Sequence, residues 1–144
     1  MGQIRNQALR EPLVDSVGHT PIVSSLCPVA DINLQTVQKA DLEFTSTYKL
    51  HINRKDTAHA LVGWFEVGFF HCHKPVILST SPRHNKTHWK QVVFYLDNPV
   101  DVNAGDVMEG SFALRKNPEQ QRELDIKVSY NVGETHSVQF YRLR

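Results

Sequence analysis

The chain has 144 residues, of which 40% are hydrophobic, so it fits one domain with a sizeable core. Its 16 basic and 15 acidic residues give a net charge of +1, which offers no large field of one sign to attract nucleic acid or an anionic membrane. No apolar run approaches the roughly 20 residues that span a bilayer, and residues 1–10 lack the apolar centre of a signal peptide. We therefore expect an intracellular protein, cytoplasmic or nuclear.

The N-terminal part of the chain is irregular. Residues 1–9 are polar and weakly periodic, which predicts a short helical or frayed lead-in. Residues 11–17 read as a strand that starts near Pro12, where a missing N–H is tolerated. The next stretch is interrupted by glycine, proline and serine, yet it is too apolar for a solvated linker, with Ile22, Val23, Leu26 and Val29. On the sequence alone, this stretch is a loop folded back on its own domain.

The middle of the chain has the patterns of β-strands. Residues 32–37 predict a strand, and residues 38–41 predict a turn. Residues 48–53 alternate apolar with polar, as in an antiparallel strand that faces water on one side. Residues 58–70 are apolar in both alternation sets and predict the central, doubly covered strand, with bulges or bends at its glycines.

Further strands are predicted over residues 89–96, 107–114, 124–130 and 137–143. Asn98-Pro99 is expected to end the first of them, and Ala104-Gly105-Asp106 predicts a turn. About eight strands joined by short turns make an all-β fold, an antiparallel β-barrel or sandwich. No long helix is expected.

A polar loop over residues 79–91 joins two of these strands and contains the triplet Thr87, His88 and Trp89. Successive side chains of a strand point to opposite faces, so either His88 or Trp89 should face away from the core. Loops of this kind carry function more often than the strands beneath them. For an unplaced His-Trp pair, however, ordinary packing or capping is the commoner role.

The loop and its surroundings resemble a protein arginine N-methyltransferase, most closely the branch that makes asymmetric dimethylarginine. In that family a domain that binds S-adenosylmethionine is followed by a C-terminal β-barrel with a Ser-Thr-x-Pro turn and a Thr-His-Trp loop. The matching residues are Ser79, Thr80, Pro82, Thr87, His88, Trp89 and Gln91, with residues 10–15, 41–44, 104–106, 109–110, 122–125 and 141–144. The resemblance covers nearly the full chain.

The resemblance implies that residues 1–144 form the substrate-binding and dimerisation barrel. The Gly-rich loop and the paired-glutamate hairpin of the cofactor domain do not occur in this chain. We therefore expect no catalytic residue, no bound cofactor and no activity from this chain alone, whereas the full-length enzyme would use S-adenosylmethionine. Trp89 would form a wall of the arginine pocket, because an indole face attracts a planar cation. His88 would contact an acidic residue of the catalytic domain, in a way that depends on pH near neutrality.

The resemblance also implies a dimerisation arm over residues 14–31. Its apolar residues Ile22, Val23, Leu26 and Val29 would grip the catalytic domain of a second protomer in a full-length homodimer. The isolated chain is expected to be a monomer whose arm is mobile or displaced. Its expected partners are an arginine-containing protein substrate and a catalytic domain of the family, in cis or in trans.

The sequence favours neither a metal site nor a catalytic nucleophile. Zinc ligands could come from His71, Cys72 and His73, with His84 and His88. However, strand alternation turns Cys72 away from its two neighbours, and no second cysteine pair has the spacing of a zinc finger. Cys27 and Cys72 are expected to be free thiols. No Gly-x-Ser-x-Gly elbow occurs.

The alternative function is a free-standing β-barrel module that binds protein or nucleic acid. Aromatic and basic residues interleaved on one exposed strand face would favour it. Lys90, Tyr95 and Arg115 do not obviously share such a face.

Overall fold

The computed structural model describes residues 10–144, so the predicted lead-in over residues 1–9 lies outside the described residues. The described part contains nine strands and one short 3-10 helix, η1 (Lys39–Leu42). The strands are β1 (Leu13–Asp15), β2 (Phe44–His51), β3 (Asp56–Gly63), β4 (Glu66–Phe69), β5 (Val76–Ser79), β6 (Gln91–Val102), β7 (Val107–Lys116), β8 (Leu124–Val132) and β9 (Thr135–Leu143). The predicted all-β fold is confirmed.

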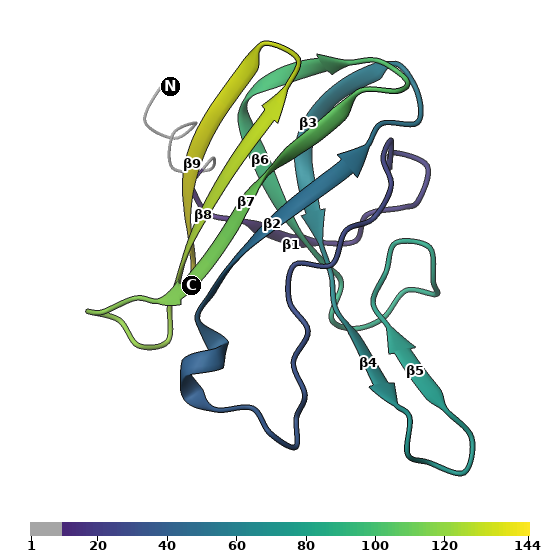
Figure 1. Cartoon of the computed structure of the whole chain (residues 1–144), viewed down its shortest axis with the longest axis vertical. Helices are drawn as coiled ribbons and strands as arrows, with labels where there is room; N and C mark the ends of the chain where they lie inside the picture. Colours follow the sequence, from purple (N-terminus) through teal and green to yellow (C-terminus); the bar gives the residue numbers. More distant parts are fainter. Residues whose placement is uncertain (1–9) are drawn as a thin grey trace.

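The strands form two larger sheets and one hairpin, and every pair is antiparallel (Figure 1). One sheet has the order β2-β7-β8-β9, the second has the order β1-β6-β3, and β4 pairs with β5. Because the two larger sheets remain separate in the described residues, the fold is a sandwich and not a closed barrel. The β4–β5 hairpin extends beyond one end of this sandwich (Figure 1).

The core lies between the two larger sheets. Phe94 of β6 meets Phe112 of β7 with ring centroids 5.7 Å apart, and it meets Tyr141 of β9 at 5.3 Å, both edge to face. Such edge-to-face pairs add about 0.5 to 1.5 kcal/mol beyond area burial. The predicted alternation of β8 is also observed, with Ile126 and Val128 buried in the core.

Two tyrosines bring hydroxyl groups into this core and pair them with backbone carbonyls. The Tyr48 hydroxyl donates to the Ser129 carbonyl at 2.8 Å, and the Tyr141 hydroxyl donates to the Tyr95 carbonyl at 2.7 Å. Burial is the main cause that raises the pKa of Tyr48 and of Tyr141 well above the usual tyrosine value. Both side chains are thus held in the neutral form that can donate.

The predicted strand over residues 32–37 is wrong. Asn33 organises a turn there, because its side-chain Oδ1 accepts from the Gln35 N–H at 3.0 Å and its carbonyl accepts from the Val37 N–H at 2.9 Å. Local pairing of this kind competes with a strand ladder. The predicted turn over residues 38–41 becomes η1, whose Asp41 accepts from the Gln38 N–H at 2.9 Å.

Residues 58–70 are not one central strand, which is a second correction. The chain bends between β3 and β4, so β3 is an edge strand on β6 and β4 belongs to the hairpin. The central strand of that sheet is β6, and it continues through Asn98-Pro99 instead of ending there. Its register shifts between the partners of Ala58 and Ala60, so Pro99 sits in an irregular stretch that tolerates the lost N–H.

Candidate functional site

The loop from Thr80 to Lys90 joins β5 to β6 and starts on a buried anchor. Thr80 is 1% exposed, and its Oγ1 donates to the Phe65 carbonyl at 2.8 Å and accepts from the Phe65 N–H at 3.1 Å. The Thr80 N–H donates to the same carbonyl at 3.0 Å. The backbone N–H and carbonyl of Phe65 are therefore both bonded to Thr80. These bonds hold the bend between β3 and β4 against the start of the loop.

Two serines shape the first turn of the loop. Ser79 Oγ donates to Glu66 Oε1 at 2.7 Å and accepts from the Ser81 N–H at 3.2 Å. Ser81 Oγ accepts from the Arg83 N–H at 3.2 Å, and the Ser81 carbonyl accepts from the His84 N–H at 3.0 Å. This turn is the Ser-Thr-x-Pro element that the sequence singles out, and its polar groups are internally paired.

The predicted triplet lies at the far side of the loop. Trp89 is 55% exposed, and its ring meets Phe65 edge to face with centroids 6.0 Å apart and an interplanar angle of 75°. His88 is also exposed, 6.5 Å from the Trp89 ring by centroids. Both side chains thus face away from the core. Trp89 contacts Phe65, while much of its indole remains exposed to solvent.

Thr87 completes the triplet in a different environment. Its Oγ1 is buried and has no hydrogen-bond partner among the described residues. An unpaired buried hydroxyl costs about 1 to 3 kcal/mol. Thr87 thus differs from His88 and Trp89, whose side chains are exposed.

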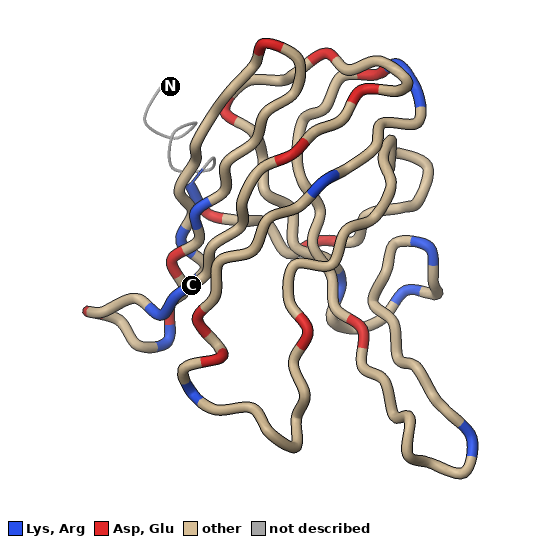
Figure 2. The backbone as a smooth tube through the Cα atoms, viewed as in Figure 1, with Lys and Arg blue, Asp and Glu red and all other residues tan. Residues whose placement is uncertain are grey.

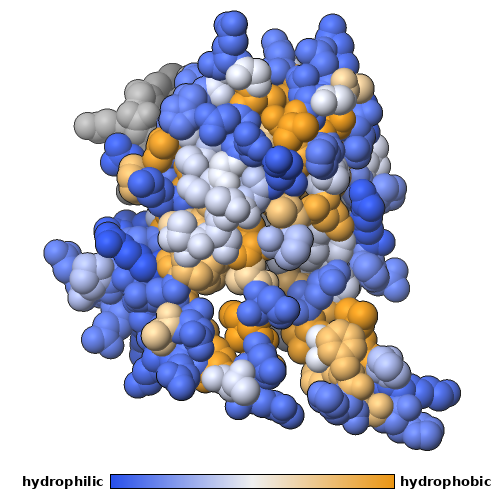
Figure 3. Space-filling view, in the orientation of Figure 1, coloured by the Kyte–Doolittle hydropathy of each residue, from blue (hydrophilic) through white to orange (hydrophobic). Residues whose placement is uncertain are grey.

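An apolar surface lies beside the loop on the β4–β5 hairpin. Its exposed side chains are Phe69, Phe70, Val76, Ile77 and Leu78, and Phe65 is exposed at the base of the hairpin. Figure 3 shows apolar surface, in orange, at the end of the molecule that carries the hairpin. A lone two-stranded hairpin is marginally stable in water, so uncovered aromatic groups on it mark an interaction surface. The sequence signal for this surface was present, because residues 58–70 are apolar in both alternation sets.

The charges within the loop are of one sign. Arg83, Lys86 and Lys90 lie within residues 81–90, which contain no acidic residue. Elsewhere Figure 2 shows basic and acidic residues interspersed along the chain. The loop is thus a small basic segment on a nearly neutral molecule.

The predicted arm over residues 14–31 contacts the sandwich of its own chain. The Ser25 N–H donates to the His51 carbonyl at 2.9 Å, and the Asn53 N–H donates to the Val23 carbonyl at 2.7 Å. Ile22, Val23 and Val29 are half-buried, whereas Leu26 is 48% exposed. This is the folded-back arrangement that the sequence alone favours.

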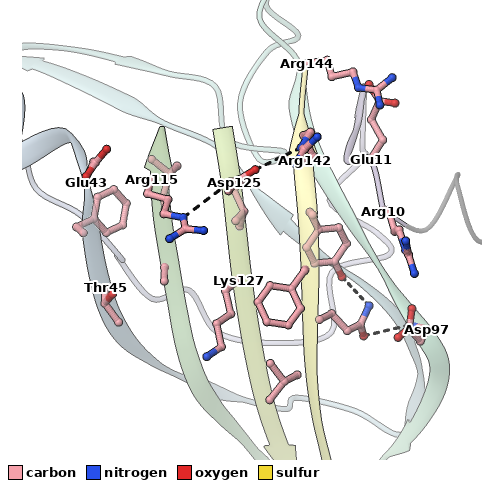
Figure 4. A pocket seen from close by; sticks show the side chains of 18 residues that line it. Arg10, Glu11, Glu43, Thr45, Asp97, Arg115, Asp125, Lys127, Arg142 and Arg144 are labelled. Atoms are coloured by element: carbon pink, nitrogen blue, oxygen red, sulfur yellow. Dashed lines mark hydrogen bonds and ion pairs between the residues drawn. The ribbon is translucent and has the colours of Figure 1, made fainter. Parts of the chain in front are cut away.

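The outer face of the four-stranded sheet carries a separate groove (Figure 4). Charged side chains on it pair with one another: Asp125 lies 3.8 Å from Arg115 Nε and 3.4 Å from Arg142 Nε. The side-chain amide of Asn117, foremost, and then these arginines lower the pKa of the Asp125 carboxyl. None of the predicted site residues lines this groove.

The histidines and cysteines form no metal-binding group in the described part of the chain. No three His, Cys, Asp or Glu side chains gather there as a metal-binding group, and Cys27 and Cys72 are free thiols. Within residues 10–144 no helix has the length and apolar character needed to cross a membrane.

Comparisons with known proteins agree with the geometry. The family model described as "Arginine methyltransferase oligomerization subdomain" matches residues 1–135. Protein arginine N-methyltransferase 1 of Chlamydomonas reinhardtii is 38% identical over 148 residues, which cover 100% of this chain and 43% of the relative. Protein arginine N-methyltransferase 1 of Schizosaccharomyces pombe is 39% identical over 127 residues, which cover 88% of this chain and 37% of the relative.

Solved structures give the same fold. A chain of the Trypanosoma brucei PRMT1 enzyme-prozyme heterotetrameric complex with AdoHcy superposes with a TM-score of 0.93 at 35% identity, over 96% of this chain and 45% of that one. Arabidopsis thaliana protein arginine methyltransferase 10 superposes with a TM-score of 0.87 at 19% identity, over 92% and 42% of the two chains, which shows the fold alone. The chain spans less than half the length of these relatives. With the family match over residues 1–135, these likenesses show that the chain belongs to the arginine methyltransferase oligomerization subdomain family, the C-terminal part of the protein arginine methyltransferases.

Proposed function

We propose that this chain is the substrate-binding and assembly part of a protein arginine methyltransferase and that Thr87, His88 and Trp89 line its arginine pocket. The observation that carries the proposal is the exposure of Trp89: its indole contacts the Phe65 ring, yet 55% of the residue remains exposed. Burying such a ring against a guanidinium contributes about 0.5 to 2 kcal/mol, depending on desolvation.

The chemistry divides between two domains. The S-adenosylmethionine-binding domain supplies the methyl group and the carboxylates that hold the arginine, and the chain described here supplies one wall of the pocket. Trp89 orients the planar guanidinium, and His88 bonds an acidic side chain of the cofactor domain. The basic character of residues 81–90 supports that contact, because charge complementarity fixes the register of two surfaces. Alone, the chain is expected to be inactive.

The β4–β5 hairpin is the proposed docking surface for the cofactor domain. It is the uncovered apolar element closest in sequence to the loop, and covering Phe69, Phe70 and Ile77 would remove large apolar groups from water. Docking there brings the loop to the domain boundary, where an arginine pocket shared by two domains must lie. Covering the loop also gives the buried Thr87 hydroxyl an opportunity to find a partner.

The assembly role extends to residues 14–31, proposed as a contact with a second protomer. Leu26 supports this role, since it is exposed and apolar on a segment otherwise held against its own sandwich. Ile22, Val23 and Val29 would have to leave their present half-buried sites to join the contact.

A chimera tests the proposed function. The segment of the Schizosaccharomyces pombe relative that aligns with this chain, 37% of its length, is replaced by the present chain. The chimera is expected to methylate an arginine peptide with S-adenosylmethionine, and Trp89→Ala should lower kcat/KM by about tenfold, equivalent to the loss of one cation–aromatic contact.

Phe140→Ala is the matched control, because Phe140 is an aromatic residue 66% exposed on β9 and outside the loop. It should leave kcat/KM unchanged. The proposal is rejected if a folded chimera binds S-adenosylmethionine but methylates nothing, or if both alanine variants are as active as the parent.

A further inference from the structure

One buried side chain, the amide of Gln91, joins separate segments of the chain at the base of the loop. Gln91 is 6% exposed and is the first residue of β6. Its Nε2 donates to the Thr80 carbonyl at 2.8 Å, and its Oε1 accepts from the Val17 N–H at 2.7 Å. The amide therefore closes the loop, whose two ends are Thr80 and Gln91, and ties it to the segment that follows β1.

The closure continues from Thr80 to the indole. Thr80 holds both the N–H and the carbonyl of Phe65, and the Phe65 ring is the surface on which Trp89 rests. A shift of Thr80 therefore moves Phe65, and a shift of Phe65 removes the support of Trp89.

Trp89 lies outside the strand ladder, and its other ring contact is with His88, in the same loop. Strand pairing begins at Gln91, and Lys90 between them has a φ of 56°, in the left-handed region that side-chain-bearing residues seldom adopt. This backbone conformation turns the chain between Trp89 and the buried Gln91. The conformation persists only where the surroundings impose it, and the buried amide is the polar group placed to do so.

We propose that Gln91 is a positioning residue for Trp89: its two hydrogen bonds fix the loop ends so that the indole stands against Phe65 in the orientation that receives an arginine. The role rests on the proposed function of the Thr87–Trp89 loop. The bond between Gln91 and Val17 also gives the loop a link to another segment of the chain. Through Val17, the position of Trp89 is coupled to the segment that follows β1.

The chain contains a matched control elsewhere in the fold. Gln139 of β9 is 4% exposed; its Oε1 accepts from the Asp97 N–H at 3.0 Å, and its Nε2 donates to the Tyr95 carbonyl at 3.2 Å and to the Tyr141 hydroxyl at 2.9 Å. Gln139→Met and Gln91→Met each remove a buried amide with bonds to two backbone groups, and methionine keeps the length of the side chain. A general loss of stability should therefore be at least as large in Gln139→Met as in Gln91→Met.

The first experiment follows Trp89 directly. The chain has two tryptophans, so Trp64→Phe leaves Trp89 as the sole tryptophan, which is excited at the long-wavelength edge where the four tyrosines do not absorb. In that background, acrylamide quenching and fluorescence anisotropy are measured on the full chain for the parent, Gln91→Met, Gln91→Glu and Gln139→Met. Glutamate can still accept from the Val17 N–H but cannot donate to the Thr80 carbonyl when ionised.

Both Gln91 variants are expected to raise the quenching constant by on the order of twofold and to lower the anisotropy, because a released loop segment samples open states. Gln139→Met should leave both signals at the parent values. The proposal is overturned if Gln139→Met moves the Trp89 signals as much as Gln91→Met does, or if Gln91→Met leaves them unchanged. Should Gln91→Met not fold, Gln91→Glu carries the same test.

The second experiment separates this inference from the proposed function. In the Schizosaccharomyces pombe chimera, Gln91→Met is expected to lower kcat up to about 100-fold, since small misplacements of a positioning group have effects of this size. S-adenosylmethionine affinity should stay unchanged. An inactive parent chimera with a normal Trp89 response rejects the proposed function alone, whereas an active chimera insensitive to Gln91→Met rejects the positioning role.

Discussion

Phe65 and Trp89 meet edge to face, with ring centroids 6.0 Å apart, although Phe65 belongs to the bend after β3 and Trp89 to the loop before β6. Phe65 is 45% exposed and Trp89 is 55% exposed, so the pair is a surface feature and not part of the sandwich core. Buried polar groups hold Phe65 in place for this contact, since Thr80 is hydrogen-bonded to both the N–H and the carbonyl of Phe65. A rigid polar base under exposed aromatic rings is suited to recognition of a flat cation.

Trp89→Ala should therefore cost little stability. The ring loses its edge contact with Phe65 but little buried area, so the free energy of unfolding should fall by about 1 kcal/mol or less. Phe94→Ala, in the core, should lower it by about 3 to 5 kcal/mol. Urea unfolding of both variants checks this expectation, and a loss from Trp89→Ala as large as that from Phe94→Ala would assign Trp89 to the core.

The sequence predicted those elements whose patterns are local. Residues 124–130 alternate over a full strand, and the polar stretch before Gln91 was correctly placed between two strands. Bends were predicted at the glycines of residues 58–70, but the division of this stretch into β3 and β4 was missed, because the bonds that fix it come from Thr80, 15 positions after Phe65. The bond from Val17 to Gln91 spans 74 positions and has no local signature at all.

Two other predictions were wrong although the residues that decided them lie within the segment concerned or beside it. Asn33 lies within an apolar stretch with strand character, but its side chain caps a turn and no strand forms. In β6 the dipeptide Asn98-Pro99 has the composition of a strand end, yet the irregular register beside it lets the strand continue. Hydrogen bonding decided the first case and the register shift decided the second, and composition decided neither.

Gly110→Ala should severely destabilise the chain. A Cβ at Gly110 would lie 1.9 Å from the Ser129 carbonyl oxygen on the neighbouring strand, and backbone atoms cannot move aside cheaply. We expect a loss of about 3 kcal/mol in the free energy of unfolding. Gly18→Ala is the control, because nothing lies within 4 Å of its Cβ, and it should change stability by less than about 0.5 kcal/mol. Equal effects in chemical denaturation would refute the close approach of β7 and β8.

The buried tyrosines predict a loss of stability in alkali. Unfolded tyrosine ionises near pH 10, whereas burial raises the pKa of Tyr48 and Tyr141 in the folded chain. Above about pH 10 the unfolded state therefore binds fewer protons, and the free energy of unfolding falls by up to about 1.4 kcal/mol per pH unit for each tyrosine.

Tyr48→Phe should make this alkaline slope shallower, and Tyr95→Phe, at an exposed position, should leave it unchanged. Urea unfolding between pH 8 and about pH 11 measures both slopes, and comparing variants removes the contribution of lysines. Identical slopes for the parent and Tyr48→Phe would contradict the burial of that hydroxyl.

The cofactor prediction concerns the chain and the chimera together. The isolated chain is expected to show no saturable heat with S-adenosylmethionine at micromolar concentrations, whereas the chimera with the Schizosaccharomyces pombe relative should bind it. Isothermal titration calorimetry of the two proteins makes the comparison. Saturable binding to the isolated chain would place a cofactor site within these 144 residues and would overturn the proposed division of labour.

The last prediction concerns assembly, and it follows from the different exposure of Leu26 and Ile22. Leu26 is exposed, so Leu26→Ser should leave the unfolding of the isolated chain unchanged and should weaken self-association of the chimera. Ile22 is half-buried on its own sandwich, so Ile22→Ser should lower stability in both proteins, by about 1 to 2 kcal/mol. Light scattering is expected to find the isolated chain monomeric at low concentration and the chimera oligomeric, because the proposed contact joins residues 14–31 to a surface outside this chain. A tight dimer of the isolated chain that persists after both replacements would exclude this segment from the protomer contact.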